Sequence, residues 1–207
     1  AVFGKDYRMR QVTDILDEIQ LRYSQGYRHF DIEDDNFTVN KADVKVLLRR
    51  IIDLALPLTF SAMNGLSYIS LDEEILSLMR RAGFSHLNLA LVSADEIVRR
   101  MTERPHTLDR FYQVLEVASR LGFRTTVYFI IGLPGQTLES MCRTLKVIAR
   151  EQCLPGVSPF YYTPGSPIHE QTHAGLRLAS AGRDPYFAAR LTAMDVESDL
   201  WERRDLY

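Results

Sequence analysis

Residues 125–137 read Thr-Thr-Val-Tyr-Phe-Ile-Ile-Gly-Leu-Pro-Gly-Gln-Thr, and this stretch decides the fold class of the chain. Its first seven residues are β-branched or aromatic, which is typical of a parallel strand that is buried on both faces. Gly-Leu-Pro-Gly and a helix follow directly. Such a turn brings bare backbone to the carboxyl end of a parallel sheet, where ligands bind, although an ordinary strand-to-helix turn has the same composition.

Strands and helices alternate on both sides of this stretch. Apolar residues recur at i, i+3 and i+4 in five segments, which predicts helices that each lay one face on a sheet. The stripes are Val12, Ile15, Leu16, Ile19; Val44, Leu47, Leu48, Ile51; Leu71, Ile75, Leu78, Met79; Leu108, Phe111, Val114, Leu115, Ala118; and Leu138, Met141, Leu145, Ile148. The strand-like runs are His29 to Glu33, Leu58 to Ala62, Leu87 to Val92, Thr125 to Ile131 and Val157 to Tyr162. This alternation predicts an α/β fold with parallel strands.

The length of the chain limits the architecture. A complete eight-unit barrel needs about 250 residues, and the pattern here opens with a helix, as though a first strand were missing. We therefore expect a partial barrel of the (β/α)6 type, with an open α/β sheet as the alternative. The alternation ends near Ala174, so residues 1–175 are predicted to form the barrel domain and residues 176–207 a peripheral C-terminal extension.

Composition excludes several classes of protein. The formal net charge of −2 gives no basic surface for nucleic acid, and no apolar run approaches the roughly 20 residues that span a bilayer. We expect a cytoplasmic protein with neither nucleic acid nor membrane as partner. The two cysteines, Cys142 and Cys153, are too few for a disulfide framework, and Cys142 is predicted to be a small buried thiol on the apolar side of its helix.

Polar residues follow the predicted strands at the edge where α/β sheets bind ligands. The first strand ends in Glu33-Asp34-Asp35-Asn36-Phe37. Neighbouring carboxylates of this kind need water, a cation or an amine to offset their repulsion, although an ordinary solvated loop has the same composition. Asn64 follows the second strand and offers a neutral amide. Ser93 follows the third strand, where its hydroxyl is either a hydrogen-bonding group or simply a helix cap.

Six segments of the chain occur together in an order that is specific to one enzyme superfamily. They are Phe3 to Arg10, Phe30 to Phe37, Asp72 to Phe84, Ser93 to Met101 with Arg104-Pro105, Phe129 to Thr137, and Phe160 to Pro167. Together they resemble the radical S-adenosylmethionine superfamily, and within it the branch whose members often carry a cobalamin-binding domain upstream. The resemblance covers about residues 3 to 170.

The resemblance implies a set of cofactor-binding residues. It places Asp34, Asp35 and Asn36 near the methionyl amino group of the cofactor. Asn64 and Ser93 would face the ribose or the carboxylate, and Ile130 and Ile131 would flank the adenine. It also implies that Gly132 and Gly135 allow close approach. In the family a [4Fe-4S] cluster and S-adenosylmethionine together supply a 5′-deoxyadenosyl radical. The parent protein is then expected to modify a small-molecule substrate, by methylation or ring rearrangement if a cobalamin domain lies upstream.

Three departures from the family pattern qualify this resemblance. The Cys-x3-Cys-x2-Cys loop that holds the cluster through three thiolates is absent from the chain. We therefore expect a truncated chain that lacks its N-terminal portion, binds no cofactor tightly and is inactive by itself, with no catalytic residue of its own. Val92 stands where the family usually has Glu or Gln, and valine cannot accept a hydrogen bond from the cofactor's ribose. Gln136 stands where Glu is common.

Two other functions compete with the radical enzyme. One is a non-catalytic (β/α) module that binds a partner or small molecule, and Val92 is its best support. The other is a zinc peptidase, because His169-Glu170-Gln171-Thr172-His173 is a literal HExxH motif. Two histidines at i and i+4 on a helix can ligate zinc with the glutamate as general base. Little apolar sequence is available to bury such a helix, so His169, Glu170 and His173 are the weaker alternative for a metal site.

Overall fold

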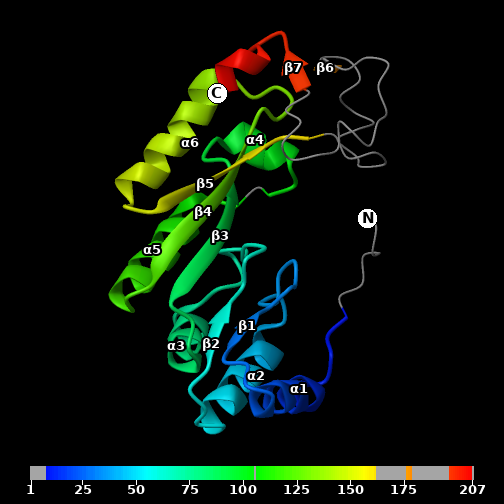
Figure 1. Ribbon diagram of the computed structural model, residues 1–207. Helices are drawn as coiled ribbons and strands as arrows, with labels where there is room; N and C mark the ends of the chain where they lie inside the picture. The colour runs from blue at the N-terminus through cyan, green and yellow to red at the C-terminus, as the bar shows by residue number, and fades with distance from the viewer. Residues whose placement is uncertain (1–7, 105, 162–175, 179–195, 207) are drawn as a thin grey trace. The chain divides into compact units, whose positions relative to one another are not determined.

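The computed structural model describes residues 8–104, 106–161, 176–178 and 196–206 (Figure 1). In chain order its elements are α1 (Val12–Ser24), β1 (His29–Asp31), α2 (Lys41–Asp53), β2 (Thr59–Ser61), α3 (Glu73–Ala82), β3 (His86–Val92), α4 (Glu96–Met101), α5 (Leu108–Arg120), β4 (Arg124–Ile131), α6 (Leu138–Arg150), β5 (Leu154–Pro159), β6 (Leu176–Leu178), β7 (Val196–Ser198) and the 3-10 turn η1 (Arg203–Leu206). The predicted alternation of strands and helices is confirmed from α1 to β5, apart from the additional helix α4 before α5.

Contacts within the chain define two compact units. Unit 1 comprises Ala1, Val92–His106 and Tyr128–Tyr207, and unit 2 comprises Val2–Leu91 and Thr107–Val127. Strand β4 therefore begins in unit 2 and ends in unit 1. It is hydrogen-bonded between β3 and β5, so the order of this sheet is β3-β4-β5. The predicted domain boundary between residues 175 and 176 stays a prediction.

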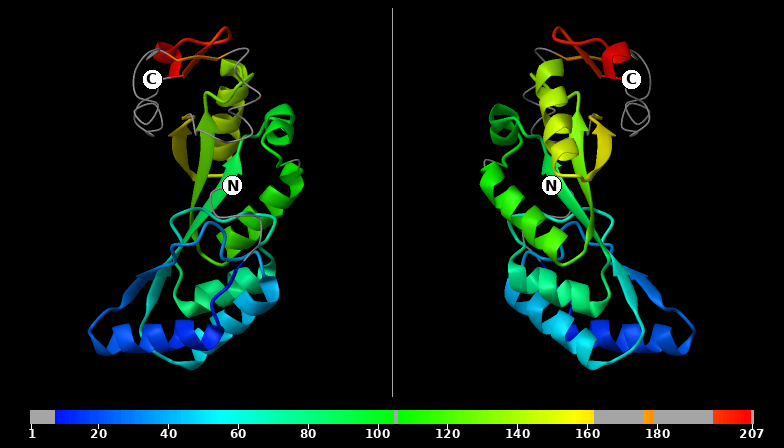
Figure 2. Two further views of the ribbon diagram at one scale, coloured as in Figure 1. Left: turned by 90° about the vertical axis from the view of Figure 1, so that its right-hand side faces the viewer. Right: turned by 90° about the vertical axis from the view of Figure 1, so that its left-hand side faces the viewer.

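Unit 2 is organised around apolar helix stripes. Strands β1 and β2 pair in parallel, with His29 opposite Thr59, and α1 and α2 lie side by side beneath them (Figure 2). The rings of Phe60 and Phe84 stack with centroids 5.3 Å apart. The predicted stripes of α2 and α3 are confirmed, because each of these residues is buried: Val44, Leu47, Leu48, Ile51, Leu71, Ile75, Leu78 and Met79.

The ends of α3 show how sequence fixes an element of unit 2. The Asp72 carboxylate accepts a hydrogen bond from the Ile75 N–H at 2.9 Å, which caps the first turn. Gly83 ends the helix with φ of +112°, a conformation that L side chains rarely adopt. A Cβ at this position would also overlap the carbonyl oxygen of Leu58. The approach of α3 to the start of β2 therefore requires glycine.

Unit 1 departs from the predictions at helix α6. Leu138 and Leu145 of the predicted stripe are 37% and 44% exposed, whereas Ser140 and Thr144 are buried. Cys142 is also exposed, so the prediction of a buried thiol is wrong. A rotation of 100° per residue places position 142 away from the face that carries 140, 141, 144 and 148. The inward face of α6 is partly polar because Thr144 hydrogen-bonds to Ala94, in the segment after β3.

Other differences concern the boundaries of elements. Strand β5 begins at Leu154, three residues before the predicted start. The short helix α4 was implied only by the alternative of a Ser93 cap, because its six residues are too few to show a clear apolar period. Strands β6 and β7 form a separate antiparallel pair in the C-terminal region. No helix in the described part of the chain is long and apolar enough to cross a membrane.

Candidate functional site

The acidic segment after β1 is an ordered turn within unit 2. The Asp34 carboxylate accepts a hydrogen bond from the Asn36 N–H at 2.8 Å, which is the geometry of an Asx turn. The Asn36 side-chain oxygen accepts a hydrogen bond from the Thr38 hydroxyl at 2.9 Å. Asp35 is exposed. Asp34 and Asn36 thus shape the turn, and the carboxylate of Asp35 points to solvent at the end of the strand.

Asn64 links the ends of two neighbouring strands. Its amide nitrogen lies 3.5 Å from the carboxylate of Glu33, which follows β1, whereas Asn64 itself follows β2. The structure therefore brings the ends of β1 and β2 together, as expected for parallel strands. This cluster of carboxylate and amide oxygens suits a ligand that carries an amino group.

A row of polar side chains on β1 and β2 escaped the sequence analysis. The Ser61 hydroxyl donates to the Asp31 carboxylate at 2.6 Å and lies 3.2 Å from Nε2 of His29. Nδ1 of the same imidazole lies 3.0 Å from the Thr59 hydroxyl. Each strand contributes two residues at i and i+2, so one face of the pair is polar. The sequence contains these residues as His-x-Asp in one strand and Thr-x-Ser in the next. Recognising them as one polar row requires the register of β1 on β2, which the sequence does not give.

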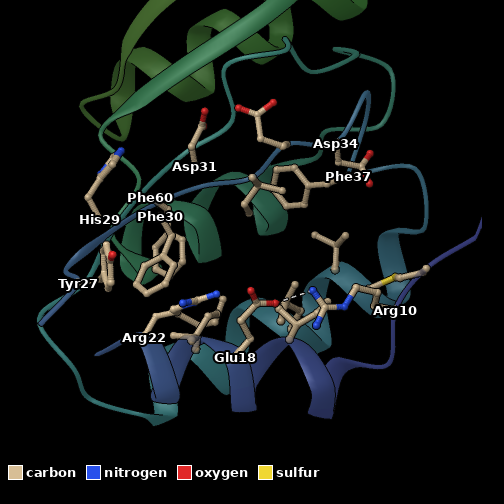
Figure 3. A pocket seen from close by; sticks show the side chains of 18 of the residues that line it. Arg10, Glu18, Arg22, Tyr27, His29, Phe30, Asp31, Asp34, Phe37 and Phe60 are labelled. Atoms are coloured by element: carbon tan, nitrogen blue, oxygen red, sulfur yellow. Dashed lines mark hydrogen bonds and ion pairs between the residues drawn. The ribbon is translucent and has the colours of Figure 1, made fainter. Parts of the chain in front are cut away.

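A pocket of about 790 Å³ lies between α1, α2 and β1 in unit 2 (Figure 3). Its apolar lining includes Phe30 and Phe60, whose stacked rings have centroids 5.7 Å apart. On the α1 side, Arg10 forms an ion pair of 2.6 Å with Glu18, and this guanidinium lowers the pKa of the Glu18 carboxyl. Asp34 lies on the β1 side. The pocket thus combines an apolar interior with charged walls.

In unit 1, the residues after β3 are held by α6. The Ala94 N–H donates to the Thr144 hydroxyl at 3.0 Å, which lies 3.3 Å from the hydroxyl of Ser93. Ser93 also accepts a hydrogen bond from the Asp95 N–H at 3.1 Å. Its side chain has no exposed surface. Asp95, rather than Ser93, caps α4 through the Ile97 N–H, so the predicted alternative of a Ser93 cap is wrong and its hydroxyl fixes the backbone instead.

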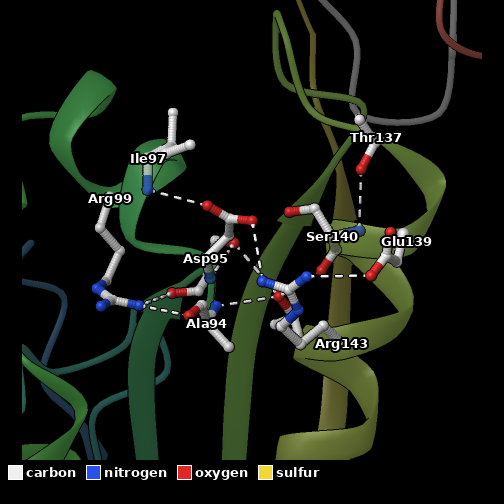
Figure 4. Close-up of polar contacts among 10 residues, drawn as sticks. Ala94, Asp95, Ile97, Arg99, Thr137, Glu139, Ser140 and Arg143 are labelled. Atoms are coloured by element: carbon white, nitrogen blue, oxygen red, sulfur yellow. Dashed lines mark hydrogen bonds and ion pairs between the residues drawn. The ribbon is translucent and has the colours of Figure 1, made fainter.

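Arg99 closes the same segment from the other side (Figure 4). Its Nη1 donates to the carbonyl oxygens of Ser93 at 3.3 Å and Ala94 at 2.6 Å, and its Nε donates to that of His106 at 2.9 Å. Arg99 is only 5% exposed. Val92, just before, has φ of +67°, which is a strained conformation for a β-branched residue. The buried hydrogen bonds of Arg99 to Ser93 and Ala94 therefore stabilise the segment in which Val92 adopts its unfavourable positive φ.

The glycine turn after β4 is equally well fixed. Gly132 and Gly135 have φ of +79° and +71°. The buried Gln136 side chain accepts a hydrogen bond from the Leu133 N–H at 3.1 Å and donates to the Ile130 carbonyl at 3.3 Å. Its amide supplies both a donor and an acceptor across the turn, which a carboxylate at this position could not do.

The two isoleucines before the turn face opposite sides of β4. Ile130 packs with the cluster of Val92, Val98 and Leu133, whereas Ile131 packs with Met141 and Trp201. Successive residues of a strand alternate in this way. A ligand beside β4 would therefore meet one of these side chains and only the backbone of the other.

The cysteines do not fit an iron–sulfur cluster. A [4Fe-4S] cluster of this family needs three closely spaced thiolates, whereas the chain has two cysteines. Cys142 lies on α6, and burial, together with the Glu151 carboxylate, raises the pKa of the Cys153 thiol to about 11. Among the described residues no group of three or more His, Cys, Asp or Glu could hold a metal ion. The motif formed by His169, Glu170 and His173 lies outside the described residues.

Comparison with known sequences agrees with these features. The family described as the radical SAM superfamily matches residues 2–148. Cytidylyl-2-hydroxyethylphosphonate methyltransferase of Streptomyces wedmorensis is 30% identical over 147 residues, which are 67% of this chain and 27% of that protein. Anaerobic magnesium-protoporphyrin IX monomethyl ester cyclase of Rubrivivax gelatinosus is 25% identical over 146 residues, 70% of this chain and 26% of that protein. The chain thus spans about a quarter of the length of these relatives.

Comparison with solved structures confirms the predicted fold class. The radical S-adenosylmethionine methyltransferase TsrM of Kitasatospora setae, solved with cobalamin and a [4Fe-4S] cluster bound, matches with a TM-score of 0.77 and 21% identity. The match covers 87% of this chain and 38% of that chain. TsrM has also been solved with tryptophan substrate and a SAM analogue bound. The predicted α/β fold, part of a (β/α) barrel, is that of the radical enzymes, and this chain belongs to the radical SAM superfamily.

Proposed function

We propose that this chain is part of the catalytic domain of a longer radical S-adenosylmethionine enzyme that modifies a small-molecule substrate. Methylation is the reaction that we propose, because two of the similar proteins are methyltransferases. The family match over residues 2–148 is the observation that carries the proposal. The cluster, S-adenosylmethionine and an upstream cobalamin supply the chemistry in the complete protein. The two cysteines of this chain do not fit the cluster, so we propose that its ligands lie in the longer protein outside residues 1–207.

The proposed cofactor residues fall into two groups with distinct chemistry. Asp34, Asp35, Asn36 and Asn64 provide oxygen and amide groups in unit 2, which suit the methionyl end of the cofactor. In unit 1, Ser93 contributes through the backbone that its hydroxyl fixes. The segment Ile130, Ile131, Gly132 and Gly135 offers apolar side chains and close backbone, which suit the adenine.

The pocket beside β1 is the structural support for an additional strand in the longer protein. The Thr59 N–H donates to Arg28 O, and the Ile32 N–H donates to Ser61 O, both at 2.9 Å. By alternation, the backbone groups of His29 and Asp31 point away from β2 and toward the other edge of β1. An additional parallel strand along this edge would cover the apolar interior of the pocket. We propose that the first strand of the complete barrel fills this place.

The test is anaerobic turnover of S-adenosylmethionine by the complete protein after iron and sulfide reconstitution. Chromatography should detect 5′-deoxyadenosine or S-adenosylhomocysteine from the reduced complete protein and neither product from residues 1–207 alone. No consumption by a complete protein that contains a cluster would overturn the proposal. Turnover by residues 1–207 alone would overturn the assignment of the cluster ligands to the longer protein outside these residues.

A non-catalytic binding module is the second candidate, and Val92 is the observation that favours it. This residue packs in an apolar cluster at the position where the family usually carries a polar side chain for the ribose. A complete protein that binds S-adenosylmethionine but lacks three cysteines at the family spacing would support this second function.

A further inference from the structure

We propose that Trp201 is a positioning residue that holds the glycine turn after β4 in the conformation required for S-adenosylmethionine binding. The proposal rests on the proposed function, in which this turn contacts the cofactor's adenine. It gives the C-terminal segment around Trp201 a role in binding, although that region was expected to be a peripheral extension.

Trp201 is tied to the turn through its indole N–H. Nε1 donates a hydrogen bond to the backbone carbonyl of Gln136 at 2.9 Å, and the side chain of Trp201 is only 4% exposed. The Gln136 carbonyl lies directly before the cap residue of α6 and would otherwise be a buried acceptor without a partner among the described residues. A buried carbonyl without a partner is costly. The indole therefore stabilises one conformation of this peptide group.

Trp201 also encloses the turn by packing. A Cβ on Gly132 would lie 3.3 Å from the indole Cη2 and 3.2 Å from Cδ1 of Leu206. The close approach that Gly132 permits in this structure is thus to the chain's own C-terminal segment. The same segment packs against Met141 of α6 and Ile131 of β4. Trp201 consequently contacts the turn from the side of β4 that faces α6.

On the opposite side of β4, beside the cluster of Val92, Val98 and Leu133, we expect the adenine to meet the chain. Ile130 projects to that side, and the Gln136 amide bridges Ile130 and Leu133 between the two faces. Trp201 orients Gln136, and Gln136 orients the backbone beside Ile130. Displacing the indole should therefore change the geometry that an adenine meets, without removing any atom that would touch it.

The first experiment measures S-adenosylmethionine affinity in the complete protein with the variants Trp201→Phe and Trp201→Ala. Phenylalanine keeps most of the packing but loses the hydrogen bond, so the Kd should rise about three- to tenfold while the Tm changes little. Alanine also loses the packing and should weaken binding further. Leu200→Ala is the matched control, because Leu200 is the neighbouring residue and is 52% exposed; it should leave both Kd and Tm unchanged.

The outcomes separate this proposal from the proposed function. Affinities of both Trp201 variants equal to that of the unsubstituted protein would overturn the positioning role. Tighter binding would also overturn it, because the segment would then obstruct the ligand. A Tm loss without a Kd change would reduce Trp201 to a structural residue. Failure of the unsubstituted complete protein to bind S-adenosylmethionine would overturn the proposed function.

A second experiment tests the docking of Trp201 without any ligand. Trp201 is the single tryptophan of residues 1–207, so the fluorescence of this chain reports the contact directly. Gly132→Ala should shift the emission to longer wavelength and increase quenching by acrylamide, because the new methyl group displaces the indole. Gly122→Ala is the control, since Gly122 has a similar φ of +75° but nothing within 4 Å of its Cβ position. Equal spectra for the two variants would overturn the docking.

Discussion

Helices α2 and α3 of unit 2 and the turns of unit 1 are stabilised in different ways. In unit 2, helices α2 and α3 contribute continuous apolar stripes, and their charges lie at the surface. In unit 1, the segment after β3 and the turn after β4 are held by buried polar side chains, namely Ser93, Arg99, Gln136 and Thr144. Apolar burial supplies stability with little directional preference, whereas a satisfied buried hydrogen-bond network specifies one arrangement. Helices α2 and α3 thus contribute mainly stability, and these parts of unit 1 contribute a defined backbone.

The largest effect should come from the apolar stripe of unit 2. Leu48→Ala removes a side chain with no exposed surface, which should lower the free energy of unfolding by about 2–5 kcal/mol. Val46→Ala on the same helix is the control, because Val46 is 47% exposed and should change stability by less than about 0.5 kcal/mol. Urea unfolding followed by circular dichroism measures both. Equal losses would show that α2 does not pack as described.

The polar network of unit 1 is broken by Arg99→Met. The variant leaves the carbonyl oxygens of Ser93, Ala94 and His106 without their donor, so we expect a loss of about 2–3 kcal/mol. Arg100→Met is the matched control. Arg100 pairs with Glu96 at the surface, and such pairs contribute at most about 1 kcal/mol. If urea unfolding gave both variants the same stability, the buried guanidinium would not organise this segment.

The surface charges of unit 2 predict a pH dependence. The Lys45 ammonium lowers the pKa of the Glu74 carboxyl, and the hydrogen bond from the Ile75 N–H together with Lys45 lowers that of Asp72 despite its partial burial. A lowered pKa stabilises the fold above the ordinary carboxyl range of about 4 and loses this contribution as the pH falls through the lowered value.

Lys45→Met should therefore reduce the loss of stability between about pH 5 and pH 2. Thermal unfolding across this range, compared with Lys146→Met on α6, measures the difference. An unchanged slope in Lys45→Met would contradict the assigned role of Lys45. The pKa of Lys45 is raised by Glu74, so the same pair should lose stability again as the pH rises through that raised value.

The smallest effect concerns two thiols of unit 1. Cys142 is exposed on α6, whereas burial raises the pKa of Cys153 to about 11. Because the thiolate is the reactive form, Cys142 should react with a thiol reagent at pH 7.5 at least about tenfold faster. Single Cys→Ser variants assign the two rates. A faster reaction at Cys153 would contradict the orientation of α6.

The contrast between the units also explains what the sequence could predict. The stripes of α2 and α3 follow from residue spacing alone, since each residue faces the core because of its own helix. Thr144 is a small polar residue, and its burial depends on a partner segment about fifty residues earlier in the chain. Trp201 likewise acts on a turn 65 residues away. Such partners are set by tertiary structure and leave no periodic signal.

In the candidate site, too, the motifs could be predicted from the sequence, whereas the contacts set by tertiary structure could not. The glycine turn and the acidic strand end were recognisable as motifs, so their positions after β4 and β1 could be predicted. The polar row of His29, Asp31, Thr59 and Ser61 required the register of β1 on β2. The internal hydrogen bonds of Ser93 and Gln136 could not be inferred, because a buried hydroxyl or amide has the same sequence signal as an exposed one.

The most direct test of the central claim is the amino-acid sequence of the complete protein upstream of Ala1. The account predicts three cysteines at Cys-x3-Cys-x2-Cys spacing, preceded by a strand-like run that pairs with β1. A complete protein without these cysteines would contradict the proposed radical chemistry, and the binding module would then be the better description of this chain.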